Sequence, residues 1–166
     1  MTIFIPPLDH GAIEAARNGI TRSPEWPRVE HEHLQLQPHC EACKPGTNLQ
    51  AKLQVHHIFP FHYCVALGRP DLELDQRNLI TLCEDEAGNP ADNHHLLVGH
   101  LDDFQSSNLD VVQDAQTTFQ GMSAADIRNN LVWQQKEAAR LKPLDQMIPQ
   151  DKADFQSEMN SWFPLE

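Results

Sequence analysis

Apolar positions near the N-terminus repeat at helical spacing. Between Asp9 and Gly19, Ile13 and Ala16 are three residues apart and would face inward, while Asp9 can cap the segment and Gly19 suits its end. Residues 23–38 begin with a capping serine followed by proline, which predicts a second helix. The inward face of that helix would hold Trp26, Val29 and His33.

The middle of the chain has the pattern of two strands followed by a helix. Residues 53–58 alternate in part between apolar and polar positions, and residues 78–83 form a second mostly apolar run. Residues 60–77 are rich in Pro, Gly and Asp and predict a loop, as does the acidic segment 84–93. Residues 94 to about 104 can form a helix, so the expected class is α+β.

The C-terminal third is predicted to be helical. Ser123 begins a capping-box pattern, and the helix it starts should end at Pro143. A last helix is indicated by Phe155, Met159 and Trp162, which lie at positions i, i+4 and i+7. We expect these helices to cover the strand-strand-helix unit; a dimerisation surface or partner-binding arm is the alternative. The aromatic residues that suggest that alternative are Trp133, Phe155, Trp162 and Phe163.

Length and charge narrow the possible classes. A chain of 166 residues is long enough for one compact domain with extensions, and no apolar run is long enough to span a bilayer. The first residues lack a signal-peptide pattern, so we expect a cytoplasmic, bacterial or phage-encoded protein. The net charge of −12 argues against simple DNA binding, although bound metal ions would offset part of the negative field.

A pair of cysteines at close spacing predicts a structural zinc site. Cys40 and Cys43 can hold one zinc ion from a single turn, and structural zinc is usually four-coordinate. Cys83 at the end of the second predicted strand, and one of the two adjacent histidines His94 and His95, would complete a Cys₃His set. The remaining cysteine, Cys64, has apolar and aromatic neighbours and is expected to be a buried hydrophobic residue.

A second group of residues has the chemistry of phosphodiester hydrolysis. His56 and His57 are consecutive in a predicted strand, so one imidazole can bind a metal while the other addresses a water molecule. A neutral histidine can act as the base, and the amide of Asn78 can orient it. His95 supplies a second metal ligand, and His100 adds either a third ligand or a structural contact.

In this order, between the zinc-ligand cysteines, these residues resemble the HNH endonuclease family (the ββα-metal, or His-Me finger, type). The resemblance runs from about residue 22 to residue 111 and rests on segments 22–27, 38–43, 53–61, 72–83 and 94–100. It implies a ββα-metal core with a structural zinc, flanked by N- and C-terminal helices. It also implies a division into an extension of residues 1–21, a nuclease domain of residues 22–112, and a helical extension of residues 113–166.

Carried over position by position, the resemblance assigns each residue a role. His56 and His95 look like ligands of the catalytic metal, with His100 in support; His57 looks like the general base and Asn78 like the residue that orients it. Related sequences usually have Cys-His where this chain has His94-His95. That alignment makes His94 the fourth ligand of a zinc held by Cys40, Cys43, Cys83 and His94.

The expected function is metal-dependent cleavage or nicking of double-stranded DNA with one catalytic divalent cation, Mg²⁺, Mn²⁺, Ni²⁺ or Zn²⁺. The alternative is a catalytically inactive, zinc-stabilised acidic module that binds a basic partner protein. The acidic charge favours the alternative, and the complete set of histidines with Asn78 favours the nuclease. A homodimer is possible in either case. Few cations that could contact phosphate lie near the motif: Arg22, Arg28, Lys44, Lys52, Arg69 and Arg77.

Overall fold

The computed structural model describes residues 9–84 and 92–165 and begins with two helices. Helix α1 spans His10–Arg17 and is capped by Asp9, whose side chain accepts a hydrogen bond from the backbone N–H of Ala12. Helix α2 spans Trp26–Leu36. Both predicted helices are confirmed, but Ser23 is not the cap of α2, because Glu25 occupies that position and makes no side-chain capping bond.

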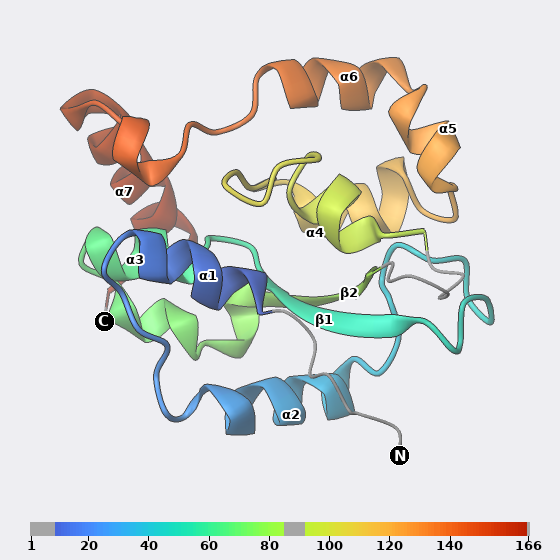
Figure 1. Ribbon diagram of the computed structural model, residues 1–166, viewed down its shortest axis with the longest axis horizontal. Helices are drawn as coiled ribbons and strands as arrows, with labels where there is room; N and C mark the ends of the chain where they lie inside the picture. The colour runs from blue at the N-terminus through green and yellow to red at the C-terminus, as the bar shows by residue number, and fades with distance from the viewer. Residues whose placement is uncertain (1–8, 85–91, 166) are drawn as a thin grey trace.

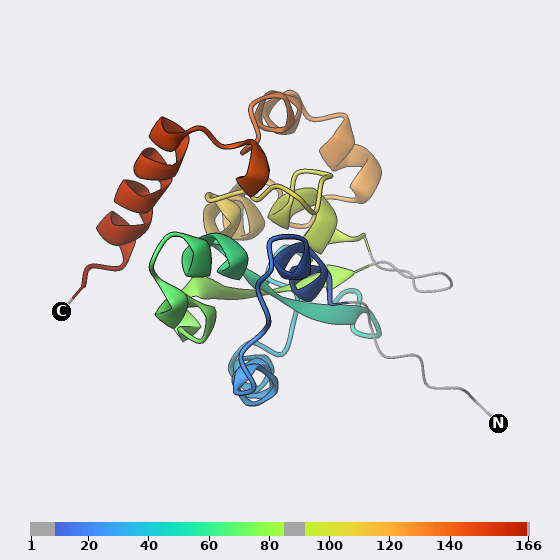
Figure 2. The ribbon, with the colours of Figure 1, turned by 60° about the vertical axis from the view of Figure 1, so that its left-hand side comes forward.

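A two-stranded antiparallel sheet lies at the centre of the molecule. Strand β1 (Lys52–His57) pairs with β2 (Leu79–Glu84), and His56 is opposite Ile80 while His57 is opposite Leu79. Helix α2 covers one face of the sheet, and the segments that follow β2 cover the other, as Figure 1 and the turned view in Figure 2 show. The mixed α+β class is therefore confirmed.

The segment between the strands is largely helical, so the prediction of a loop over residues 60–77 is wrong. It contains α3 (Phe61–Ala66) and two 3₁₀ turns, η1 (Pro70–Glu73) and η2 (Gln76–Asn78). Proline and glycine in this segment lie at the ends of short helices rather than throughout a loop. The side chains of residues 61–64, the first four of α3, are all buried.

The helix predicted after β2 is short and has an unusual pitch. Of the second predicted loop, residues 85–91 lie outside the described residues. After them the structure has a π-helix, η3 (His95–Gly99), rather than a helix extending to residue 104. It ends because Leu101 and Asp102 have φ angles of 51° and 69°, in the left-handed region that cannot continue a right-handed helix.

The C-terminal part consists of short helices joined by tight turns. After α4 (Val111–Gln113) and a second π-helical turn, η4 (Asp114–Thr118), the single helix expected from residue 123 is divided into two. The division falls at Asn130, whose side chain caps a new helix by accepting from the backbone N–H groups of Val132 and Trp133. The remaining elements are α5 (Ala124–Arg128), α6 (Leu131–Ala138), the 3₁₀ turn η5 (Leu144–Gln146) and α7 (Pro149–Trp162).

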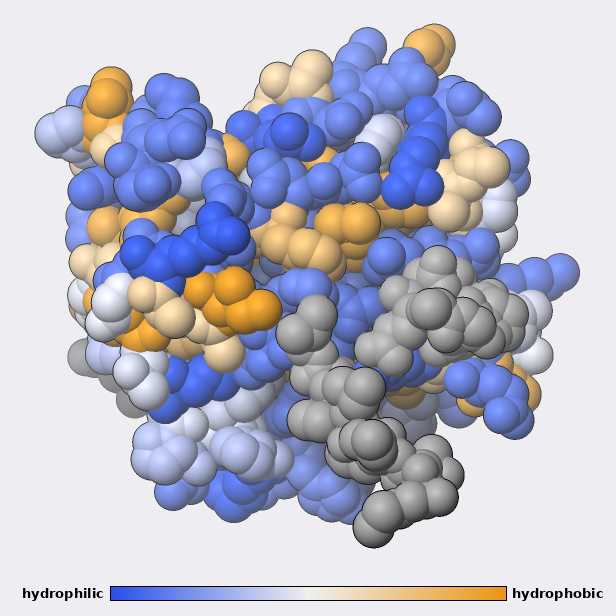
Figure 3. Space-filling view, viewed as in Figure 1, coloured by the Kyte–Doolittle hydropathy of each residue, from blue (hydrophilic) through white to orange (hydrophobic). Residues whose placement is uncertain are grey.

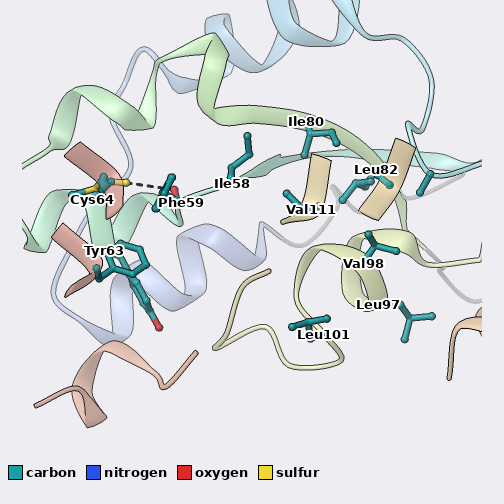
Figure 4. Packing of buried hydrophobic residues seen from close by; sticks show 14 of the residues in the cluster. Ile58, Phe59, Tyr63, Cys64, Ile80, Leu82, Leu97, Val98, Leu101 and Val111 are labelled. Atoms are coloured by element: carbon teal, nitrogen blue, oxygen red, sulfur yellow. Dashed lines mark hydrogen bonds between the residues drawn. The ribbon is translucent and has the colours of Figure 1, made fainter. Parts of the chain in front are cut away.

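One hydrophobic cluster joins the sheet to the C-terminal helices. Ile80 and Leu82 of β2 face Leu97 and Val98 of η3, as Figure 4 shows, and the same cluster includes buried residues of α7 such as Phe155. The C-terminal helices therefore pack on the sheet unit. Cys64 belongs to this cluster and is fully buried, which agrees with its predicted role as a hydrophobic residue.

A smaller cluster fixes α2 on the other face of the sheet. Trp26 and Val29 of α2 pack against Val55 and Leu79 of the strands. The face of the molecule drawn in Figure 3 is mostly hydrophilic with scattered apolar patches. No helix among the described residues is long and apolar enough to cross a membrane.

Candidate metal centres

Three cysteines and a histidine converge beneath the end of the sheet. Cys40 and Cys43 come from the turn after α2, Cys83 from β2 and His94 from the residue before η3. The Nδ1 atom of His94 lies 3.5, 3.4 and 3.3 Å from the sulfur atoms of Cys40, Cys43 and Cys83. The predicted Cys₃His set is thus brought together with His94, not His95, as its histidine.

The spacing of these four atoms suits a tetrahedral zinc ion. Zinc bonds of about 2.3 Å to sulfur and about 2.1 Å to nitrogen put ligand atoms roughly 3.5–3.8 Å apart. The sulfur atoms of Cys43 and Cys83 are 3.8 Å apart, and none of the four cysteines forms a disulfide. Hydrogen bonds from Cys40 and Cys83 lower the pKa of the Cys43 thiol, which favours the thiolate that zinc requires. This buried cluster is compatible with structural zinc.

Neighbouring groups hold the ligands of the Cys₃His cluster in place. The Nε2–H of His94 donates to the carbonyl oxygen of Met122 at 2.9 Å, which leaves Nδ1 free to face the sulfur atoms. The side-chain amide of Asn48 donates to the sulfur of Cys43 at 3.3 Å. Hydrogen bonds of this kind orient metal ligands and tune their basicity. Because Met122 follows η4, this cluster also connects the C-terminal helices to the sheet.

A second group, of three histidines, lies where η3 packs against β1. His56, His95 and His100 each offer a nitrogen atom, and these atoms lie within 4.8 Å of one another. An ordinary α-helix would turn residues five apart by about 140° away from each other. The wider π-helical turn instead brings the Nε2 atoms of His95 and His100 to 3.2 Å.

The hydrogen bonds of these imidazoles leave one nitrogen of each for a ligand. The Nδ1–H of His95 points to a carboxylate oxygen of Glu84 at 3.3 Å, and that of His100 to the carbonyl oxygen of Ser106 at 2.6 Å. Each Nε2 therefore carries a lone pair. The Nε2 of His56 is buried and has no hydrogen-bond partner among the described residues, although a buried polar atom normally has one. A bound metal ion would satisfy all three nitrogens.

Two residues beside this group were not expected from the sequence. Glu84, the last residue of β2, is buried, and its carboxylate accepts from His95 and from His10 of α1, whose Nε2 lies 3.0 Å away. The ring of His10 stacks on Phe104 with 3.7 Å between centroids. Burial raises the pKa of Glu84, but its two histidine partners outweigh burial and lower it well below its usual range. The one sequence signal for Glu84 is its position directly after Cys83.

His57 lies on the opposite face of β1 from His56, as strand alternation predicts. Its ring packs against Trp26 of α2, with 4.7 Å between centroids. Burial and the nearby charge of Arg22 lower the pKa of His57 to about 3, so the imidazole is neutral at physiological pH. The Nε2–H donates to the backbone oxygen of Glu73 at 2.8 Å, which leaves the lone pair on Nδ1.

The contact expected between Asn78 and His57 is not made, so the prediction of direct orientation is wrong. The side-chain oxygen of Asn78 accepts from the backbone N–H of Phe59, and its amide donates to the carbonyl oxygens of Phe59 and Leu72. Asn78 thus joins the end of β1 to η1, the turn that carries Glu73. The group that fixes His57 is a backbone carbonyl, and a side-chain motif cannot indicate such a group.

One small cavity connects His57 with the three-histidine group. Its volume is about 40 Å³, and its walls come from α1, α2, β1, α3, η3 and Arg22. His56 and His57 both line it although they leave β1 on opposite faces. The fold therefore brings the four histidines predicted for the catalytic metal and the base to one cavity.

The whole sequence matches no protein-family model, and no curated protein or solved structure matches it either. The functional argument therefore rests on the residues and geometry of this chain.

Proposed function

We propose that the protein is a metal-dependent endonuclease of the HNH (ββα-metal) type that hydrolyses phosphodiester bonds of DNA. The observation that carries the proposal is the cavity in which three histidine nitrogens converge beside a neutral histidine with a free Nδ1. A purely structural metal site needs no base next to it. The order strand, strand, short helix, with a Cys₃His cluster at its end, also fits this type.

Each residue has a role in the proposed reaction. His56, His95 and His100 would hold one divalent cation, which supplies positive charge for the phosphate and the leaving oxygen. His57 accepts a proton from the attacking water at Nδ1, while the Glu73 carbonyl keeps the other ring proton on Nε2. The low pKa of His57 keeps it in the base form, and an approaching phosphate raises its proton affinity.

The Cys₃His cluster has a structural role in this proposal. A zinc ion there would fasten the turn after α2, the end of β2 and the start of η3 to one another. His95 directly follows the zinc ligand His94, so a zinc ion would also fix the beginning of the helix that carries two catalytic ligands.

Nicking of supercoiled plasmid tests the proposal. Purified protein is titrated with Mg²⁺, Mn²⁺, Ni²⁺ and Zn²⁺ at low salt, with His57→Ala and His100→Ala alongside. We expect metal-dependent nicking by the parent protein. The nicking rate should fall about 10²–10⁴-fold in His57→Ala. His100→Ala should still nick, but it should need a higher metal concentration to do so. No nicking with any metal, in protein that holds one zinc per chain, would favour an inactive zinc-stabilised module that binds a basic partner through its acidic surface.

A further inference from the structure

Arg22 is held rigidly at the wall of the cavity. Its guanidinium lies over the rings of Trp26 and Phe61, 4.2 Å from each centroid, and 14% of its side chain is exposed. Because the two rings cover the guanidinium, its N–H edges are left for binding. Arg22 is also the one lysine or arginine among the described residues that line the cavity.

A carboxylate occupies the N–H edge of Arg22. The Nε–H and Nη2–H groups donate to the two oxygens of Asp9 at 2.6 and 2.8 Å. The third nitrogen, Nη1, has no hydrogen-bond partner in the part of the chain that the structure describes, and it lies 3.8 Å from a carboxylate oxygen of Glu73. The planar fork of an arginine binds carboxylate and phosphate in the same two-pronged manner. Asp9 therefore stands where a phosphate would bind, and 41% of its side chain is exposed to solvent.

The cavity is too small for a nucleotide while α1 is in this position. A volume of about 40 Å³ holds roughly three water molecules. Besides Asp9, the first turn of α1 contributes His10 and Gly11 to the wall. An ideal Cβ on Gly11 would lie 2.6 Å from Nη2 of Arg22, so α1 approaches the guanidinium as closely as glycine permits.

Few contacts hold α1 over the cavity. Among the described residues, α1 buries only Glu14 and Ala15, its polar contacts to the site are those of Asp9 with Arg22 and of His10 with Glu84, and the ring of His10 stacks on Phe104. Segments with few buried apolar contacts open at low free-energy cost. Moving α1 would leave β1, η3 and the candidate metal ligands in place.

We propose that the fork of Arg22 is the phosphate-binding site of the nuclease, and that Asp9 occupies it in the resting protein as an internal stand-in for the phosphate. The inference rests on the proposed function. It adds a positively charged side chain, the guanidinium of Arg22, that an otherwise acidic nuclease needs for binding phosphate. α1 then moves aside when a DNA phosphodiester exchanges with Asp9. The acidic surface elsewhere repels DNA, so this one contact contributes a large share of the affinity.

The test compares Asp9→Asn, Arg22→Gln and the double variant, with Arg28→Gln as the matched control. Asparagine keeps an oxygen for the Ala12 N–H and removes the competing charge. Arg28 is exposed on α2 and pairs with carboxylates of its own helix. Affinity for a fluorescent 20-base-pair duplex is measured as a function of salt concentration, in zinc-loaded protein without added divalent cation. Metal titration of each variant checks that the three-histidine group is unchanged.

We expect Asp9→Asn to bind the duplex at least about threefold more tightly than the parent. Arg22→Gln should bind about tenfold more weakly, with the salt slope smaller by about 0.9, the value for one lost phosphate contact. In the double variant the gain from Asp9→Asn should vanish. If Arg22→Gln does not fold, Arg22→Lys replaces it; it should keep the slope and lose several-fold in affinity, because lysine has no fork.

Weaker binding by Asp9→Asn, or an Arg22→Gln protein that behaves like Arg28→Gln, would overturn the inference while leaving the nuclease proposal intact. A parent protein that neither nicks nor binds DNA would overturn the nuclease proposal instead. In that case, titration of the Asp9→Asn protein with inorganic phosphate tests whether Arg22 binds phosphate. Binding that disappears in the double variant supports the Arg22 phosphate site, and no binding refutes it.

Discussion

Gly99→Ala is a sharp test of the three-histidine group because a single methyl group would press on one ligand. An ideal Cβ at residue 99 would lie 3.1 Å from both Cε1 and Nδ1 of the His56 ring and 3.2 Å from Leu82. Ordinary contacts begin near 3.4 Å, so the ring must shift by a few tenths of an ångström. Its neighbours are buried, and the backbone oxygen of Gly99 is held by Asn108 at 2.9 Å.

The expected magnitudes follow from two opposing effects. Overpacking of a buried site costs about 1–3 kcal/mol, and alanine in place of glycine in a helix returns up to about 1 kcal/mol. With the three-histidine group empty, the zinc-loaded protein should therefore lose at most about 3 kcal/mol of unfolding free energy. Metal–ligand distances vary by only about 0.2 Å, and a ring shift of a few tenths of an ångström exceeds this, so we expect the affinity for a divalent ion to fall about tenfold, or about 1.4 kcal/mol.

Calorimetric titration of zinc-loaded protein with Ni²⁺ measures this affinity. Zinc content should stay at one per chain, since Gly99 does not touch the Cys₃His cluster, and Leu131→Ala on the exposed surface of α6 serves as the control. A Gly99→Ala protein that binds Ni²⁺ as tightly as the parent would refute the reasoning, because the His56 ring would then not be a ligand.

Three further predictions address the zinc cluster, the base and a buried histidine. Cys40→Ala should lose zinc and several kcal/mol of unfolding free energy, seen as a zinc-to-protein ratio near zero and a lowered Tm; unchanged stability would contradict a structural ion. His57→Gln should keep the parent's Tm within a few degrees but lose nicking, whereas retained nicking would exclude His57 as the base. Burial, with a smaller effect from Arg22, lowers the pKa of His62 to about 4. Below about pH 6.5, His62 of the unfolded chain binds a proton that it does not bind in the folded protein. Its contribution to the free energy of unfolding is therefore full above that pH and falls by about 2 kcal/mol at pH 5. Replacing His62 with Phe should flatten this loss in urea titrations at pH 7 and pH 5, and an unchanged loss would contradict it.

The sequence by itself determined the elements with a strong local pattern and most of the candidate metal-ligand residues. Alternation placed His56 and His57 on opposite faces of one strand, and the spacing of Cys40 and Cys43 fixed two ligands of a cluster. The capping residue Asp9 located α1, and helical spacing located α2 and α7. These features depend on neighbouring residues, whose relation is already set by the chain.

Tertiary structure decided which distant groups meet. The resemblance had already selected His94 for the Cys₃His cluster, and the structure brings it to the three cysteines. The convergence of His95 with His100 depends on the π-helical turn of η3, which no periodicity reveals. The partner of His57 is the carbonyl of Glu73, and every residue carries a carbonyl, so sequence cannot single one out. The pairing of Asp9 with Arg22 joins residues on opposite sides of α1. It exists because packing folds that helix back over the edge of β1.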